Sequence, residues 1–154
     1  MVRAPMLFDR AESAADALAL DDGHRRRTFG ELDQCVARIA RWLRDGLGLG
    51  ADDHVTTLVG NRVEAVELIL GAFAAGVWIT PLNWHLTADE LAYIVADAGA
   101  RLLVTDAEHA ALARAAVAPL AAPPRVVEVG DDLDALLAAT PAAPLPSPAP
   151  PAAR

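Results

Sequence analysis

Residues 70–92, LGAFAAGVWITPLNWHLTADELA, contain the pattern that most restricts how this chain can fold. The stretch reads as the end of an apolar helix, then a short buried strand, then a second helix. Thr87 and Glu90 have the spacing of a capping box, in which each side chain accepts a hydrogen bond from the backbone amide of the other residue. A helix, a strand and a helix this close together predict a layered α/β structure.

The same alternation of strand and helix extends along most of the chain. Capping-box spacings predict helix starts at the pairs Thr28/Glu31, Asn61/Glu64, Thr87/Glu90 and Thr105/Glu108. Apolar runs predict strands at residues 54–59, 77–82, 101–104 and 125–129. Because these runs lack polar alternation, both faces of the sheet are expected to be covered. The sequence therefore predicts an α/β fold of the doubly wound kind, with a parallel sheet covered by helices on both faces.

Three parts of the chain differ in composition. Residues 1–30 form an amino-terminal arm with a short hairpin, in which residues 17–20 and 25–28 flank an Asp-Asp-Gly-His turn. Residues 31–140 carry the α/β alternation. Residues 141–154 contain six prolines and five alanines, which is typical of a disordered linker. A linker ordinarily leads to a further domain, so we expect this chain to be a shortened form of a longer protein.

The predicted helix at residues 62–75 differs from its neighbours. Its apolar side chains lie almost all round the helix axis, so the sheet alone cannot cover them. Two interpretations are open. The helix packs against the amino-terminal arm or Trp42, or it presents a docking face to a further domain or subunit.

Composition restricts the class of protein. The chain has 154 residues, enough for one domain with its own core, and its net charge of −8 disfavours nucleic-acid binding. A single cysteine excludes an internal disulfide, and Asp9 and Glu12 interrupt any secretory signal, so we expect a cytoplasmic protein. The longest uncharged run begins at Leu68 and is interrupted by Gly71, Gly76, Pro81 and Asn83, so it does not supply the roughly 20 apolar residues that a membrane span needs. All thirteen basic residues are arginine, so no lysine is available for chemistry.

Two glycine-containing segments are candidate anion sites. The run Gly46-Leu-Gly-Leu-Gly50 follows a helix and precedes a strand, which is the wrong order for a phosphate loop, and it is interpreted as a helix stop. The segment Gly60-Asn61-Arg62 follows a strand and precedes a helix, as anion sites do. One glycine is a weak signal, so this segment is either ordinary capping or a ligand contact.

The remaining candidates are an aromatic loop, the histidines and the cysteine. Asn83-Trp84-His85 follows the carboxyl end of a predicted parallel strand, where ligands of open α/β sheets bind, and is either a ligand contact or loop packing. Cys35 lies on an apolar helical stripe, as expected of an inert core thiol. No nucleophile elbow is present. The four histidines, His24, His54, His85 and His109, have no metal-binding spacing, so no zinc site is predicted.

Three segments carry a resemblance to a known family. Residues 28–32, TFGEL, resemble the first core motif of the adenylate-forming superfamily, which includes acyl-CoA synthetases, peptide-synthetase adenylation domains and firefly-type luciferases. Residues 70–83 resemble its second core motif. Residues 86–104 continue the likeness in the style of bacterial fatty acyl-CoA synthetases. The order and spacing agree from about residue 9 to the proline-rich tail.

The resemblance implies an enzyme that joins a carboxylic (fatty) acid to ATP, releases pyrophosphate, and passes the acyl group from AMP to coenzyme A. Such an enzyme uses ATP, Mg²⁺ and CoA. The family's working groups are a Ser/Thr/Gly-rich loop with a lysine, a glutamate associated with magnesium, an aspartate for the ribose, and a lysine on a carboxyl-terminal domain. None has a counterpart here, so no catalytic, cofactor-binding or metal-binding residue is assigned.

Three hypotheses follow. The first is an amino-terminal fragment of an ATP-dependent acyl-CoA synthetase, inactive alone, whose missing remainder docks on the helix at residues 62–75. The second is one half of a split enzyme with a separate partner polypeptide. The third is a stand-alone ligand-binding or interaction domain that retains the fold without the catalysis.

Overall fold

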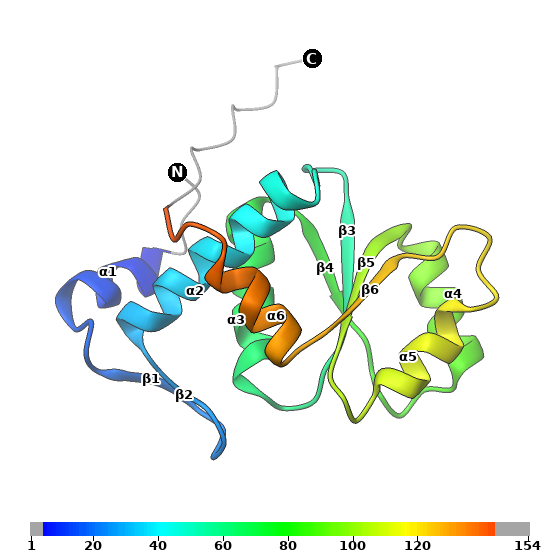
Figure 1. The fold of residues 1–154 in the computed structure, drawn as a ribbon, viewed down its shortest axis with the longest axis horizontal. Coiled ribbons are helices and arrows are strands. Elements are labelled where there is room, and N and C mark those ends of the chain that lie inside the picture. The colour runs from blue at the N-terminus through cyan, green and yellow to red at the C-terminus, as the bar shows by residue number, and fades with distance from the viewer. Residues whose placement is uncertain (1–4, 144–154) are drawn as a thin grey trace.

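Four parallel strands form the central sheet of the computed structural model, which describes residues 5–143 (Figure 1). Along the sheet the order is β4-β3-β5-β6. The bounds are β3 His54–Leu58, β4 Trp78–Pro81, β5 Ala100–Thr105 and β6 Arg125–Glu128. A separate antiparallel hairpin consists of β1 Leu18–Asp21 and β2 Arg26–Thr28. Both the parallel sheet and the amino-terminal hairpin were predicted from the sequence and are confirmed.

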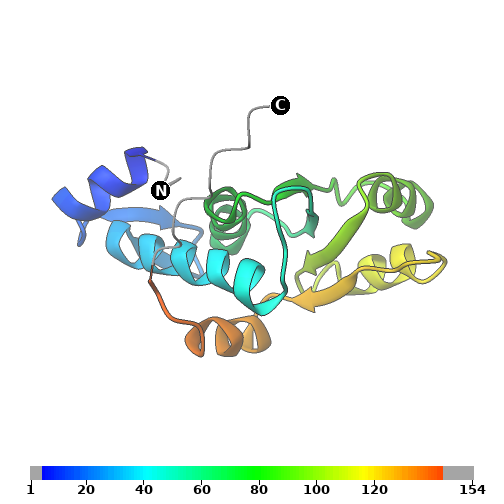
Figure 2. The ribbon, with the colours of Figure 1, turned by 90° about the horizontal axis from the view of Figure 1, so that it is seen from above.

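Helices cover both faces of the sheet (Figure 2). On one face lie α2, α3 and α6, and on the other lie α4 and α5. Helix α1 packs against α2 beside the hairpin. The bounds are α1 Pro5–Ser13, α2 Phe29–Arg41, α3 Val63–Ala75, α4 Ala88–Asp97, α5 Ala110–Val117 and α6 Asp131–Ala138. Helix α2 runs directly into a π-helical turn, η1 Trp42–Gly46, which ends at the glycine predicted to stop it. The predicted α/β fold is therefore confirmed.

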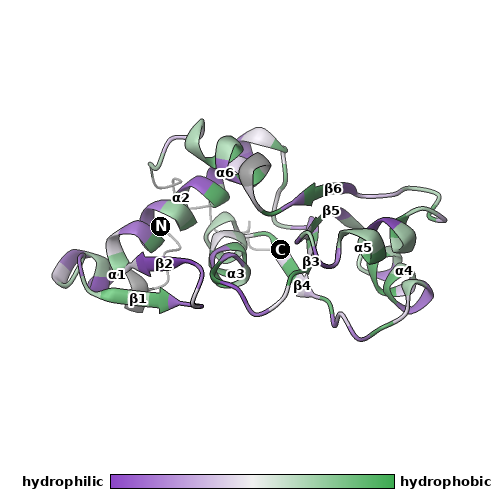
Figure 3. Cartoon of the chain, turned by 60° about the horizontal axis from the view of Figure 1, so that its bottom comes forward, coloured by the Kyte–Doolittle hydropathy of each residue, from purple (hydrophilic) through white to green (hydrophobic). Residues whose placement is uncertain are grey.

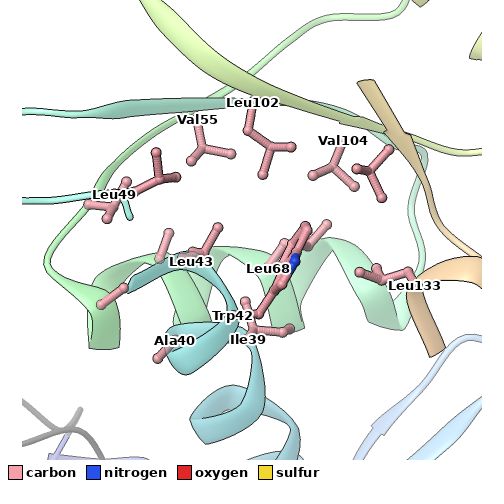
Figure 4. Close-up of a cluster of buried hydrophobic side chains, with 14 of the residues drawn as sticks. Ile39, Ala40, Trp42, Leu43, Leu49, Val55, Leu68, Leu102, Val104 and Leu133 are labelled. Atoms are coloured by element: carbon pink, nitrogen blue, oxygen red, sulfur yellow. The ribbon is translucent and has the colours of Figure 1, made fainter. Parts of the chain in front are cut away.

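Two hydrophobic cores form, one on each side of the sheet. On the first side Val55, Leu102 and Val104 project from the strands toward Leu43 and Leu68 of the helices (Figure 4). On the second side the core contains Leu58, Leu91, Val95, Leu103 and Ala113. Alternate residues of β5 enter opposite cores because successive side chains of a strand point to opposite faces. This explains why the strands read as continuous apolar runs.

Two of the predicted capping boxes are present. Thr28 Oγ1 accepts a hydrogen bond from the Glu31 amide at 3.2 Å, and Glu31 Oε2 accepts one from the Thr28 amide at 2.8 Å. Thr87 and Glu90 make the same reciprocal bonds at the start of α4. Helix α4 ends as predicted, with Gly99 at a left-handed φ of 59° directly after the C-cap residue Ala98.

The other two predicted capping boxes are wrong. Helix α3 begins one residue later than predicted, and its N-cap residue Arg62 makes no side-chain cap bond. The Val63 amide instead donates to Asp22 Oδ2 of the hairpin turn at 2.8 Å. Thr105 is the last residue of β5, where its hydroxyl donates to the Leu58 carbonyl at 3.0 Å. In both cases a distant segment, which local spacing does not reveal, provides the partner. Asp22 caps α3 in place of Asn61, and the Thr105 hydroxyl bonds to the Leu58 carbonyl instead of capping a helix.

Within residues 5–143, no helix is both long and apolar enough to cross a bilayer. The predicted linker at 141–154 lies outside the described residues except for its first three, where the Ala143 carbonyl accepts a hydrogen bond from Arg41 Nε.

Candidate functional site

The carboxyl ends of β3, β4 and β5 meet where the strand order changes direction. From β3 the chain moves to β4 on one side and then returns past β3 to β5 on the other, so β3 and β5 flank a topological switch point. Ligands of open α/β sheets bind in the crevice at such points. We therefore take the residues that follow these three strands as the candidate functional site.

Asp106 occupies the centre of this site. Its Oδ2 accepts a hydrogen bond from the Gly60 amide after β3 at 2.8 Å, which joins the ends of β3 and β5. Its Oδ1 accepts one from the His109 amide at 3.0 Å and lies 2.6 Å from His109 Nδ1. Burial by itself raises the pKa of the Asp106 carboxyl, but the bonds from Gly60 and His109 outweigh it and hold that pKa below its ordinary value. Asp106 is therefore a buried, ionised acceptor.

An aromatic cluster lies beside this carboxylate. The Trp84 ring is 3.6 Å from the His85 ring and 5.7 Å from the His109 ring, measured between centroids. Asn83 Oδ1 accepts a hydrogen bond from the His85 amide at 3.0 Å and so shapes the loop. The structure thus brings the predicted Asn83–Trp84–His85 segment to the switch point. Sequence reasoning did not place Asp106 and His109 in this site, although the Asp-x-x-His sequence directly after a strand could have indicated it.

The other predicted anion segment has its polar groups already engaged. The Gly60 amide donates to Asp106, and the Arg62 guanidinium lies 3.2 Å from a Glu64 carboxylate oxygen. That hydrogen bond raises the pKa of Arg62. The Gly46–Gly50 run lies before β3, at the opposite end of that strand, and Gly48 takes a left-handed φ of 64° there. This position agrees with its interpretation as a helix stop and turn.

These residues do not fit a bound triphosphate. A phosphate cradle needs free backbone amides and uncompensated cations, whereas here the Gly60 amide and Arg62 both serve carboxylates of the chain itself. Among the described residues no group of three or more His, Cys, Asp or Glu is placed to hold a metal ion. Of the histidines, His85 and His109 flank Trp84, His54 stacks on Trp78 at 6.0 Å, and His24 lies in the hairpin turn.

A second polar cluster joins the hairpin to α3. Two carboxylates of α3, those of Glu64 and Glu67, are buried with 2% residue exposure each. Arg27 Nε of the hydrophilic strand β2 (Figure 3) donates to Glu67 Oε1 at 2.7 Å, and Arg25 Nε lies 3.5 Å from Glu64 Oε1. Burial and Glu67 raise the pKa of the Cys35 thiol to about 12, so Cys35 is the inert core thiol that was predicted.

Helix α3 is covered on one side only. It packs against α2, where Gly71 meets Ile39, and it also contacts η1, which contains Trp42. Val66 and Phe73 nevertheless remain 37% and 59% exposed. With the partly buried Leu70 they form an outward stripe at positions i, i+4 and i+7. We call these three residues the α3 stripe.

Comparisons with known proteins give a consistent result. A family model described as "AMP-binding enzyme" matches residues 7–153. The chain is 38% identical to a 2-succinylbenzoate–CoA ligase from Geobacillus kaustophilus over 104 residues, 68% of this chain and 21% of that protein. It is 35% identical to a 3-hydroxybenzoate–CoA ligase from Aromatoleum sp. over 120 residues, 78% of this chain and 23% of that protein. The chain thus spans about a fifth of the length of these relatives.

A solved structure agrees. The inhibitor-bound N-terminal domain of FACL13 from Mycobacterium tuberculosis superimposes with a TM-score of 0.82 at 27% identity, covering 92% of this chain and 36% of that domain.

Proposed function

Because the chain belongs to the AMP-binding enzyme family, we propose that it is an amino-terminal part of an ATP-dependent acyl-CoA synthetase. Such an enzyme joins a carboxylic acid to ATP, giving acyl-AMP and pyrophosphate, and then transfers the acyl group to the thiol of CoA. The observation that carries the proposal is the match over residues 7–153, together with similarity to CoA ligases of which this chain spans about a fifth. A fatty acid is the substrate class we infer, and the cytoplasm is the proposed location.

We propose that the chain by itself has no ligase activity. It contains no lysine, and its groups at the switch point are paired with one another. Holding and neutralising the phosphates of ATP requires donors and cations that are free to contact them. We therefore assign ATP, Mg²⁺ and CoA binding to the remainder of the enzyme, with residues 1–30 and 31–140 as scaffold and 141–154 as linker.

The remainder of the enzyme is proposed to dock on the α3 stripe. An exposed phenylalanine and valine, with a partly buried leucine between them, form an apolar strip at helical spacing that a soluble protein ordinarily covers. The opposite side of α3 is held to α2 and to the hairpin, so the strip has a fixed orientation. This surface serves equally for a remainder in the same polypeptide or for a separate partner.

A chimera tests the proposed function. Residues 5–143 replace the corresponding segment of the Geobacillus ligase, and exchange of pyrophosphate into ATP is measured with 2-succinylbenzoate. We expect no exchange from the isolated chain and clear exchange from the chimera. Phe73→Glu in the chimera should reduce exchange at least about tenfold, because a buried unpaired charge costs more than 1.4 kcal/mol. The matched exposed residue Tyr93, changed to Glu, should have little effect.

Three outcomes would contradict the proposal. Exchange by the isolated chain would show that it carries its own catalytic groups. A folded chimera without exchange, together with a monomeric isolated chain that unfolds cooperatively, would favour the stand-alone interaction domain. Co-purification of a larger polypeptide with the native protein would identify the split enzyme instead.

A further inference from the structure

The two edges of the central sheet differ in the hydrogen-bonding groups that they present. The Trp78 amide of β4 donates to the Asp53 carbonyl directly before β3, and the Leu82 amide directly after β4 donates to the Thr57 carbonyl of β3. The backbone groups of the alternate residues Ile79 and Pro81 therefore face outward. Proline has no amide hydrogen, which leaves Ile79 as the single outward donor of this strand. Proline on an edge strand prevents further pairing. The β4 edge is therefore closed to a long additional strand.

The β6 edge presents a full set of backbone groups. The Val129 amide donates to the Thr105 carbonyl at 2.7 Å, and the parallel register pairs Val127 with Val104. Alternate residues therefore bond to β5, and the amides and carbonyls of Val126 and Glu128 point away from the sheet. No proline lies between Arg125 and Val129. Within residues 5–143 no strand pairs with this side of β6.

Open space lies along this edge. A hollow of about 370 Å³ is lined by the whole of β6, by Arg114 of α5 and by Leu136 of α6. Helices α5 and α6 cover opposite faces of the sheet, so the edge of β6 is recessed between them (Figure 2). An added strand would lie about 4.8 Å from β6 and enter this recess. One row of its side chains would meet Leu136, which is partly buried, and the other would meet the Arg114–Glu128 ion pair.

The segment that directly follows α6 is poorly placed to fill the recess. The steps from β4 to β5 and from β5 to β6 carry their helices, α4 and α5, on one face of the sheet. A right-handed step beyond β6 needs its helix on that same face, but α6 lies on the opposite one. Arg38 Nη1 also holds the Leu137, Ala138 and Thr140 carbonyls against α2. The occupant therefore comes from a more distant segment.

We propose that the β6 edge is an assembly site, at which an extended strand from the remainder of the acyl-CoA synthetase adds to the sheet through the backbone of Val126 and Glu128. The proposal rests on the proposed function and adds a second contact to that of the α3 stripe. The strand carries apolar residues at alternate positions toward α6 and polar residues toward Arg114. Backbone pairing supplies the affinity, as in other cases of strand addition.

Residue-resolved amide hydrogen exchange tests this site in the chimera described above. In the isolated chain we expect Val126 and Glu128 amides to exchange rapidly, while Val127 and Val129 are protected. In the chimera, exchange at Val126 and Glu128 should slow on the order of 100-fold, since pairing makes it depend on local opening. The Val126 amide points outward and makes no bond to β5, so Val126→Pro removes an outward donor and leaves the sheet intact. This substitution should abolish the protection at Glu128. Ile79→Pro removes the outward donor of the β4 edge and should leave that protection unchanged.

The exchange readout is independent of ligase activity. Rapid exchange at Val126 and Glu128 in a folded chimera would overturn the assembly site whether or not pyrophosphate exchange is present. Protection in a chimera without activity would support the site while contradicting the proposed function. If the isolated chain already shows protection that increases with protein concentration, the occupant is a second copy and the proposal is wrong. If the chimera does not fold, the chain is mixed with the Geobacillus ligase from which the corresponding segment has been removed. Exchange of the Val126 and Glu128 amides is then measured in the mixture. Exchange that does not change on mixing would overturn the assembly site.

Discussion

At the scale of single residues, arginines and carboxylates connect segments that are far apart in sequence. Arg27 of the hairpin binds the buried Glu67 of α3, and Asp22 of the hairpin turn accepts the first amide of α3. Arg38 and Arg44 of the α2–η1 helix donate to carbonyls at the carboxyl ends of α6 and α3. These cations lie where the helix dipole favours them. Arginine suits these positions better than lysine would, because one guanidinium can bond several carbonyls at once, as that of Arg38 does.

The Arg27–Glu67 pair should contribute strongly to stability. Arg27→Met leaves the Glu67 carboxylate buried, with 3% side-chain exposure and without its nearest cation, so we expect a loss of about 3 kcal/mol in the free energy of unfolding. Urea denaturation of the parent chain and of Arg27→Met measures this loss in the free energy of unfolding. The adjacent Arg26 pairs with Asp21 at the exposed surface, and Arg26→Met should cost less than about 1 kcal/mol. Equal effects of the two substitutions would contradict a special role for the buried pair.

Asp22 should make stability depend on pH. Backbone amides of Arg25, Val63 and His24 hold the pKa of the Asp22 carboxyl well below its usual range. The folded state then binds fewer protons than the unfolded state, so the stabilisation is fully present above the unfolded pKa of about 3.9 and is lost as the pH falls below it. Asp22→Asn should lower stability at pH 6, and the difference from the parent chain should narrow between pH 4.5 and pH 3.

Urea titrations of both chains across this range check the prediction. Asp97→Asn, at an exposed position of α4, is the control. A constant difference between the parent chain and Asp22→Asn over the whole range would show that the carboxylate charge is not the cause.

At the scale of elements, the contact between α2 and α3 determines how the first face of the sheet is covered. Gly71 lies in the middle of α3, where alanine would ordinarily be preferred. A Cβ atom at this position would overlap Ile39 Cγ2 and lie 2.6 Å from Ile39 Cβ. The glycine therefore allows α2 to approach α3 closely, and this contact buries Ile39 to 1% exposure.

Gly71→Ala distinguishes helix propensity from packing. Propensity alone would stabilise the chain by about 1 kcal/mol, whereas overpacking typically costs about 1–3 kcal/mol. Because Ile39 is enclosed on all sides, we expect net destabilisation, measured by urea unfolding. A double-mutant cycle with Ile39→Ala should show favourable coupling, since the smaller side chain makes room for the new methyl group. A stabilised Gly71→Ala chain would show that the two helices separate easily.

At the scale of the whole molecule, the four-stranded sheet and its helices leave uncovered the two surfaces that we propose for assembly. The α3 stripe is exposed on one side, and the edge of β6 is unpaired within residues 5–143. The β4 edge is limited by Pro81.

The exposed stripe should make the isolated chain bind hydrophobic probes. We expect fluorescence enhancement of an anilinonaphthalene dye, and association detectable by sedimentation velocity. Phe73→Ser should reduce both, because Phe73 contributes the largest exposed side chain of the stripe. Tyr93→Ser removes a similarly large exposed ring from α4 and serves as the control. Equal reductions would mean that exposed aromatic residues in general, and not the stripe, recruit the dye.

The candidate site was predictable in part. The position of Asn83–Trp84–His85 followed from the rule that loops after parallel strands gather at one end of the sheet. The Asp106–Gly60 bond was not predictable, because it depends on β5 lying beside β3, 46 residues away in sequence. His109, which follows β5, reaches Trp84, which follows β4, because both of these strands lie beside β3.

By itself the sequence determined the order of the strands and of helices α2 to α5, and also the helix starts at Thr28 and Thr87, whereas α1 and α6 were not predicted. These properties depend on apolar spacing and on side chains three residues apart, which are local. Only the tertiary structure decided that Asp22 caps α3, that Thr105 ends β5 instead of starting a helix, and which side of α3 remains exposed. Each of these outcomes depends on a partner from a distant segment, whose proximity arises only when the chain folds.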